Sequence, residues 1–170
     1  MRQALVFAVV MVASVYAHIF FISILGIPWL ILPLASLAVW AHLHRRGLLA
    51  GALIGGLTYD IIVPGTFGIV TLAFVTTAFI HRKISKLPIT EDHPIVAFSH
   101  GCVGVIIFFA VLGIGRAVVA LFTAGQVYQA VSNFPYQTVV GIALAHGVLT
   151  VAYAVLRELI VRPKKSFVLP

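Results

Sequence analysis

The chain has 170 residues, of which 62% are hydrophobic and 9% charged, and its mean hydropathy is +1.15. A soluble domain carries about 25% charged residues, so this composition excludes a water-soluble globular domain. The formal net charge is +7, but the Lys and Arg residues lie in short clusters between apolar segments. Such clusters set membrane topology and argue against nucleic-acid binding. The single cysteine, Cys102, leaves no disulfide or multi-cysteine metal site within one chain.

Six apolar segments follow one another along the chain. A hydrocarbon core about 30 Å thick takes about 20 apolar residues per helix, so the length allows about six spans. Long runs without alternation favour helices over a β-barrel. We therefore predict an all-α, single-domain bundle of about six transmembrane helices. The predicted helical segments are residues 4–25, 29–43, 47–63, 66–80, 95–115 and 136–160.

The first apolar segment has two interpretations. Arg2 and the small residues near Ala17 resemble a signal peptide and its cleavage site. A single Arg is a weak positive region, however, and cleavage would leave an odd number of spans. We expect the segment to be retained as the first helix.

Basic residues occupy every second loop, which predicts that both chain ends face the cytoplasm. Arg2 precedes the first segment, whereas the opposite set of loops holds only Arg116. Residues 116–135 start apolar and become polar, so we expect either an extension of the fifth helix or a short interfacial helix. The remaining basic loop residues are Arg45, Arg46, Arg82, Lys83, Lys86, Arg162, Lys164 and Lys165.

The third segment carries a glycine face. Gly47, Gly51 and Gly55 recur every four residues, with Gly56 adjacent. Without Cβ atoms two helix backbones can approach closely, and dispersion packing then holds them together in lipid. This spacing predicts close packing inside the bundle, with docking of a partner's helix as the alternative.

Asp60 lies near the outer end of the same segment. An acid within a membrane helix costs about 2.5–3.5 kcal/mol, so it requires a partner. The predicted topology brings Asp60 and Arg116 to the same membrane face, and an ion pair between them is one hypothesis. Capping of a neighbouring helix N-terminus is a second, and a proton or cation site is a third.

The histidines within the apolar segments, His18, His100 and His146, fall at different depths in this topology. Metal binding requires several ligands at one place, so we expect hydrogen-bonded packing roles and no metal site. A second group lies beside basic residues and is expected to face headgroups or water: His42, His44 and His81.

Enzyme motifs are missing from the sequence, which contains no HExxH, no Gly-x-Ser-x-Gly and no phosphate-binding loop. Glu91-Asp92-His93 lies in a short loop between prolines, where a solvated turn is expected. With four acids in the chain, general acid–base catalysis has few candidates. We expect a protein that is not an enzyme and needs no cofactor.

Residues 45–84 resemble the MreD family of bacterial rod-shape-determining membrane proteins. That family has a glycine-studded helix ending in an Asp, a short Pro/Gly turn, and a Gly that opens the next helix. The resemblance covers about a quarter of the chain closely, and small size, about six spans, a basic C-terminus and Pro28 agree with it. The matching positions are Gly51, Gly55, Asp60, Pro64, Gly65 and Gly68.

The resemblance implies a non-enzymatic subunit of the cell-elongation and peptidoglycan-synthesis machinery in the bacterial inner membrane. Such a subunit binds MreC and, through the complex, associates with MreB, RodA and a class B penicillin-binding protein.

The chain also resembles the substrate-binding subunits of energy-coupling-factor vitamin transporters. Those subunits dock their coupling protein through Ala-x-x-x-Ala motifs, which occur here at Ala4–Ala8 and Ala13–Ala17. This alternative implies an apolar ligand near Trp29, Asp60 and Arg116.

Overall fold

The computed structural model describes residues 2–25, 32–43, 47–63, 68–84, 94–123 and 136–161. Within these ranges all regular secondary structure is helical, which confirms the all-α prediction. The helices are α1 (Arg2–Leu25), α2 (Leu32–Leu43), α3 (Leu48–Ile62), α4 (Ile69–Ile84), α5 (Pro94–Thr123) and α7 (Tyr136–Val161).

The helix boundaries follow the predicted apolar segments closely, except in α5. That helix does not end at residue 115 but continues through Arg116 to Thr123. The extension of the fifth helix is therefore the correct alternative as far as Thr123, and residues 124–135 lie outside the described part of the chain.

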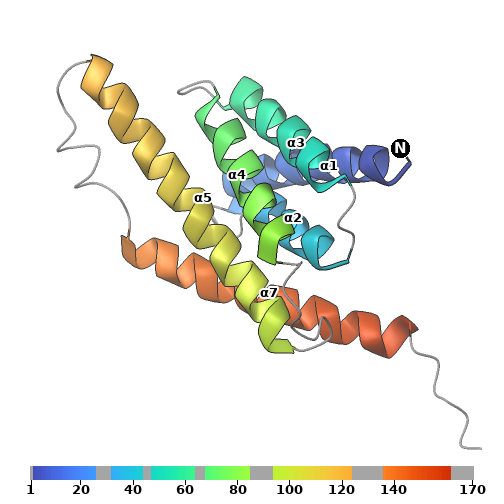
Figure 1. Cartoon of the computed structure of the whole chain (residues 1–170). Helices are drawn as coiled ribbons and strands as arrows, with labels where there is room; N and C mark the ends of the chain where they lie inside the picture. The colour runs from blue at the N-terminus through green and yellow to red at the C-terminus, as the bar shows by residue number, and fades with distance from the viewer. Residues whose placement is uncertain are drawn as a thin grey trace, which may run out of the picture.

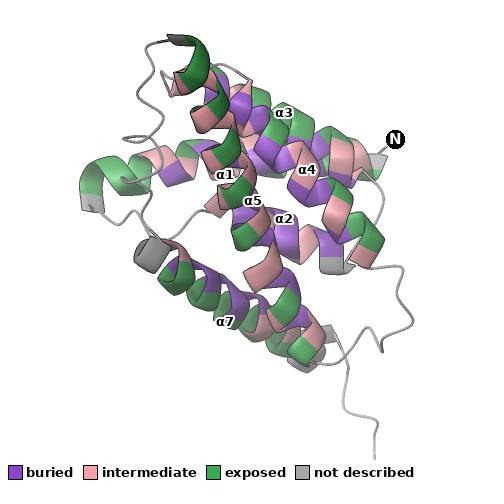
Figure 2. Cartoon of the chain, turned by 60° about the vertical axis from the view of Figure 1, so that its left-hand side comes forward, coloured by how far each residue is buried: buried purple, intermediate pink, exposed green. Residues whose placement is uncertain are grey.

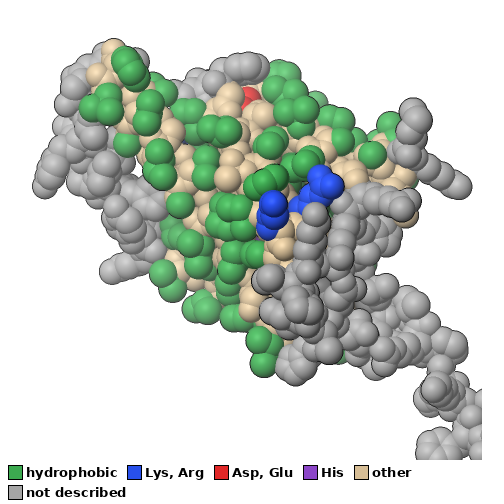
Figure 3. Space-filling view, viewed as in Figure 1, with side chains coloured by type: hydrophobic (Ala, Val, Ile, Leu, Met, Phe, Trp, Pro, Cys, Tyr) green, Lys and Arg blue, Asp and Glu red, His purple; other side chains and the backbone are tan. Residues whose placement is uncertain are grey.

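Three helices are long and apolar enough to cross a membrane, judged by length and composition: Gln3–Ile24, Ile95–Phe122 and Val139–Leu156. Two shorter apolar helices cover Leu32–Ala41 and Leu48–Ile62. Hydrophobic side chains cover much of the face in Figure 3, and the outward faces of the helices in Figure 2 are exposed. An exterior of this kind is suited to lipid rather than to water.

The helices form an arc around α2. Along this arc α1 contacts α3, α3 contacts α4, α4 contacts α5, and α5 contacts α7, which crosses it (Figure 1). α2 contacts each of the other five described helices. The second helix is therefore the centre of the bundle, although it is the shortest of them at 12 residues.

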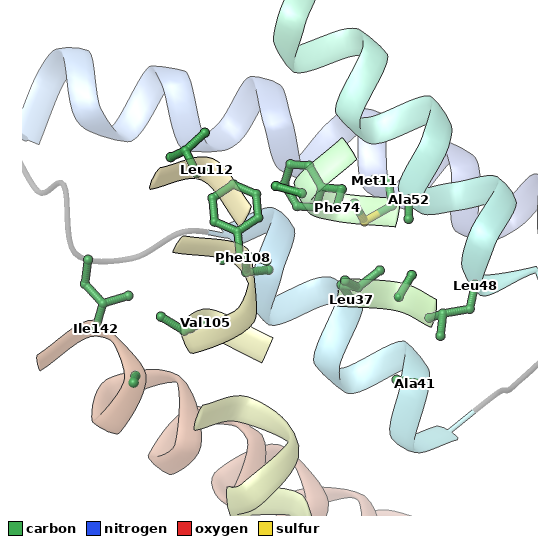
Figure 4. Close-up of a cluster of buried hydrophobic side chains, with 14 of the residues drawn as sticks. Met11, Leu37, Ala41, Leu48, Ala52, Phe74, Val105, Phe108, Leu112 and Ile142 are labelled. Carbon is green, nitrogen blue, oxygen red and sulfur yellow. The ribbon is translucent and has the colours of Figure 1, made fainter. Parts of the chain in front are cut away.

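The hydrophobic core surrounds the inner side of α2. Leu37 of α2 is fully buried, and side chains from the other helices converge around it (Figure 4). Phe74 of α4 packs on Phe108 of α5 with ring centroids 4.9 Å apart. At the edge of this core, Phe7 of α1 stacks on Trp40 near the end of α2, with centroids 4.6 Å apart. The start of α1 thus lies beside the end of α2, so these two helices run in opposite directions.

The glycine face of α3 lies against α1. A Cβ atom at Gly47 would stand 2.6 Å from the Cα atom of Ala4, and one at Gly55 would stand 2.7 Å from Cε of Met11. A Cβ atom at Gly51 would overlap the ring of Phe7. These contacts advance together along both chains, so α1 and α3 run in the same direction. The glycine spacing thus serves packing within the chain.

α5 runs opposite to α4. Gly115, in the later half of α5, lies beside Ile69 at the start of α4, where an added Cβ atom would stand 2.7 Å from Cγ2. Gly104, in the earlier half, lies beside His81 near the end of α4. The start of α4 and the later half of α5 therefore occupy the same end of the bundle.

Replacing Gly51 by Ala should lower the free energy of unfolding by about 1–3 kcal/mol, because the added methyl group forces a repacking of the buried Phe7 ring. Thermal unfolding in detergent measures this loss. Gly141→Ala is the matched control, since a Cβ atom there meets nothing within 4 Å. Equal stability of the two variants would contradict a packing role for Gly51.

Candidate functional site

Asp60 in the last turn of α3 binds the beginning of α4. The carboxylate is buried, and its Oδ2 atom accepts three hydrogen bonds. The backbone N–H groups of Gly68 and Thr71 donate at 3.0 Å each, and the hydroxyl of Thr71 donates at 2.6 Å. A carboxylate with three donors is stable in a buried position, because hydrogen bonds replace its lost hydration.

This arrangement is a helix cap supplied by another helix. The first N–H groups of a helix have no partner within it, and an acid there also interacts favourably with the helix dipole. Gly68 has φ +94° and its carbonyl accepts from Leu72 at 2.9 Å, so it begins the hydrogen-bond ladder of α4. A glycine suits this position because of its backbone angle, since a Cβ atom would meet no neighbour within 4 Å.

A second close contact reinforces the same junction. A Cβ atom at Gly56 of α3 would stand 2.5 Å from the Cα atom of Thr71, so the two backbones touch one turn away from the cap. Gly56, Asp60, Gly68 and Thr71 together fix α3 against α4. We call these four residues the hairpin junction.

The hypothesis of an Asp60–Arg116 ion pair is wrong, because no salt bridge joins these two described residues and Oδ2 serves the cap instead. Their placement at one end of the bundle is correct. Gly115 lies beside Ile69, and the Arg116 charge is close enough to interact with the hydroxyl of Tyr59, the residue before Asp60. The capping alternative is the one that the structure contains. Pro64 and Gly65 lie outside the described residues.

His81 does not face headgroups or water as predicted; it is 1% exposed. Its Nδ1 atom lies 2.9 Å from Nδ1 of His100, so one ring nitrogen donates a proton and the other accepts it. A Cβ atom at Gly104 would stand 2.6 Å from Nε2 of His81, so the imidazole occupies a notch in α5. The basic neighbours Arg82 and Lys83 suggested a surface position, but each helical residue turns by about 100° from the last.

The expectation that the intramembrane histidines stay apart from other histidines is thus wrong for His100. His146 and His18 match their predicted packing roles better. His146 is buried and its Nδ1 atom bonds the carbonyl of Ile142 at 2.9 Å, and His18 packs 6.0 Å from the ring of Tyr59. Among the described residues no group of three or more potential metal ligands converges.

A second glycine junction, between α5 and α7, was not foreseen. A Cβ atom at Gly101 would stand 2.5 Å from the carbonyl oxygen of His146, and one at Gly147 would stand 2.6 Å from the ring of Phe98. Cys102 donates its thiol to the carbonyl of Ala143 at 3.3 Å. Rising numbers on α7 match falling numbers on α5, so these helices run in opposite directions. Two isolated glycines form no periodic face, which is why the sequence gave little signal.

Comparison with protein families, curated proteins and solved structures finds no match. The functional argument therefore depends on the residues of the hairpin junction and on the surfaces around it. The described members of the family-like motif, Gly51, Gly55, Asp60 and Gly68, all serve packing or capping. Arg116 lies apart from them, exposed on α5.

Asp60→Ala should lower the free energy of unfolding by about 1–3 kcal/mol, because it leaves the donors of Gly68 and Thr71 without their acceptor. Asp60→Asn keeps an acceptor oxygen and should lose less. Thr58→Ala is the control, since Thr58 bonds only the carbonyl of Ile54 in its own helix. Exchanging Asp60 and Arg116 should restore nothing in thermal unfolding. Rescue by the exchange would reinstate the ion pair.

Proposed function

We propose that this chain is a non-enzymatic membrane subunit of the bacterial cell-elongation machinery, similar to the MreD family. It binds MreC and helps to organise RodA and the class B penicillin-binding protein in the inner membrane. The observation that carries the proposal is the ordered motif from Gly51 to Gly68, in which Asp60 caps the helix that Gly68 opens. A motif whose residues hold two helices together, rather than contact a substrate, is what an interaction subunit requires.

We also propose that the bundle crosses the membrane six times, with both ends in the cytoplasm. Two independent observations support this topology. Basic residues alternate along the sequence. The contacts between neighbouring helices give α1, α3 and α5 one direction and α2, α4 and α7 the other. Successive helices therefore alternate, as successive membrane crossings must.

Reporter fusions test this topology. Green fluorescent protein fused after residues 46, 86 or 170 should fluoresce, because it folds in the cytoplasm. Alkaline phosphatase fused after residues 65 or 128 should be active, because it needs the outer side. An active phosphatase at residue 170 would overturn the even number of crossings.

The transporter alternative draws less support. Its docking motif at Ala4–Ala8 would have to be free on the surface of α1, but Ala4 packs on Gly47 and Ala8 is buried. The first Ala-x-x-x-Ala motif thus contributes to packing between α1 and α3. This use of the motif favours the elongation subunit over the vitamin-binding subunit.

Purification of the tagged chain from its own cells in mild detergent tests the proposed function. MreC and the elongation penicillin-binding protein should co-purify, because the bundle offers its surface to their membrane helices. A tagged multi-span protein of similar size and expression level is the control. Recovery of an ATP-binding cassette module in place of MreC would contradict the proposal and favour the transporter subunit.

A further inference from the structure

The later half of α5 extends beyond the core. Its 30 residues are about 45 Å long at 1.5 Å per residue, against about 30 Å of hydrocarbon. The span Ile95–Phe122 is 17% buried, whereas the spans in α1 and α7 are each 28% buried. Leu121 and Phe122 are 64% and 86% exposed, and this end of α5 projects away from the other helices (Figure 1).

Arg116 is exposed within this projecting part, and the acids of its own chain do not serve it. The chain contains four acids. Asp60 caps α4, and Glu91 and Asp92 directly precede Pro94, which lies about 33 Å along α5 from Arg116. Glu158 follows Gly147 on α7, and Gly147 already lies beside Phe98 near the start of α5. A counter-charge for Arg116 must therefore come from outside the chain.

The position of Arg116 creates a conflict that the chain alone does not resolve. If Arg116 lies at headgroup depth, the apolar residues 117–123 extend about 10 Å further and expose Leu121 and Phe122 to water. If those residues lie in hydrocarbon, the guanidinium is drawn into the membrane, where a charge is costly. A partner that supplies both an acid and an apolar surface removes both costs.

The face of α5 around Arg116 is shaped for a helix. Gly113, Ala117 and Ala120 lie three or four residues from Arg116 or from each other, so they share its side of the helix. Small residues let a second backbone approach closely in lipid. The core-facing residues of α5 lie on another side: Phe108, Leu112 and Val119.

We propose that this face of α5 docks a membrane-spanning helix that carries an acidic side chain opposite Arg116. The inference rests on the proposed function, in which the chain holds a partner with a single membrane helix. Charge complementarity selects the occupant. A lipid phosphate neutralises Arg116 only at headgroup depth and leaves Leu121 and Phe122 uncovered, whereas a helix with an acid near its outer end satisfies both.

A synthetic helix tests the proposal without the natural partner. The full chain, fused to a fluorescent protein, is reconstituted in phosphatidylcholine vesicles with a labelled Leu/Ala-rich transmembrane peptide that has one Glu near one end. Energy transfer should report association at least about tenfold tighter for this peptide than for the same peptide with Gln. Arg116→Leu should abolish the preference and Arg116→Lys should retain part of it. Arg82→Leu, at an exposed arginine of α4, should leave it unchanged.

Equal association of the Glu and Gln peptides, or an unchanged preference in Arg116→Leu, would overturn the proposal. A preference that disappears when the vesicles contain phosphatidylglycerol would assign Arg116 to lipid phosphate and would also overturn it. The outcome is separate from the recovery of MreC. A Glu preference without MreC would leave the docking face in place and remove the proposed function, and MreC recovered equally by wild type and Arg116→Leu would do the reverse.

Discussion

The capping of α4 by Asp60 is the contact on which the arrangement of the bundle depends. An acid in an apolar helix is tolerated because three donors at the start of α4 surround one carboxylate oxygen. The cap sets the end of α3 beside the start of α4 and thereby fixes their opposite directions. With α4 held on one face, the glycine face of α3 turns towards α1. The order α1, α3, α4 along the arc follows from these two faces of one helix.

Each neighbouring pair along the arc is joined by a different short-range device. Glycines join α1 to α3 and α5 to α7, the carboxylate of Asp60 joins α3 to α4, and the pair of His81 and His100 joins α4 to α5. Lipid is as apolar as the helices, so burial of apolar surface contributes little to their association. Close backbone contact and hydrogen bonds between helices must supply it, and this explains why small and polar residues mark every junction.

The sequence predicted the helices and their alternation because both depend on coarse features, namely apolar length and the position of basic residues. It did not decide between Arg116 and a helix cap as the partner of Asp60, since that choice depends on the local turn before α4 and on its rotation. The orientation of His81 failed for the same reason, because one residue of helical rotation separates it from exposed Arg82. The fifth helix was predicted too short because Arg116 was treated as a loop residue, although arginine is a good helix former.

The polar groups inside the bundle are occupied by structural tasks. Thr77 and Thr150 donate to carbonyls of their own helices. Asp60 caps α4, and His81 bonds His100. A ligand bound in the interior would have to displace bonds that hold the helices together, at a cost to the bundle itself. The exterior carries no such constraint. Function for this chain is therefore best sought on its lipid-facing surface, where Arg116 interrupts an otherwise apolar and least buried helix.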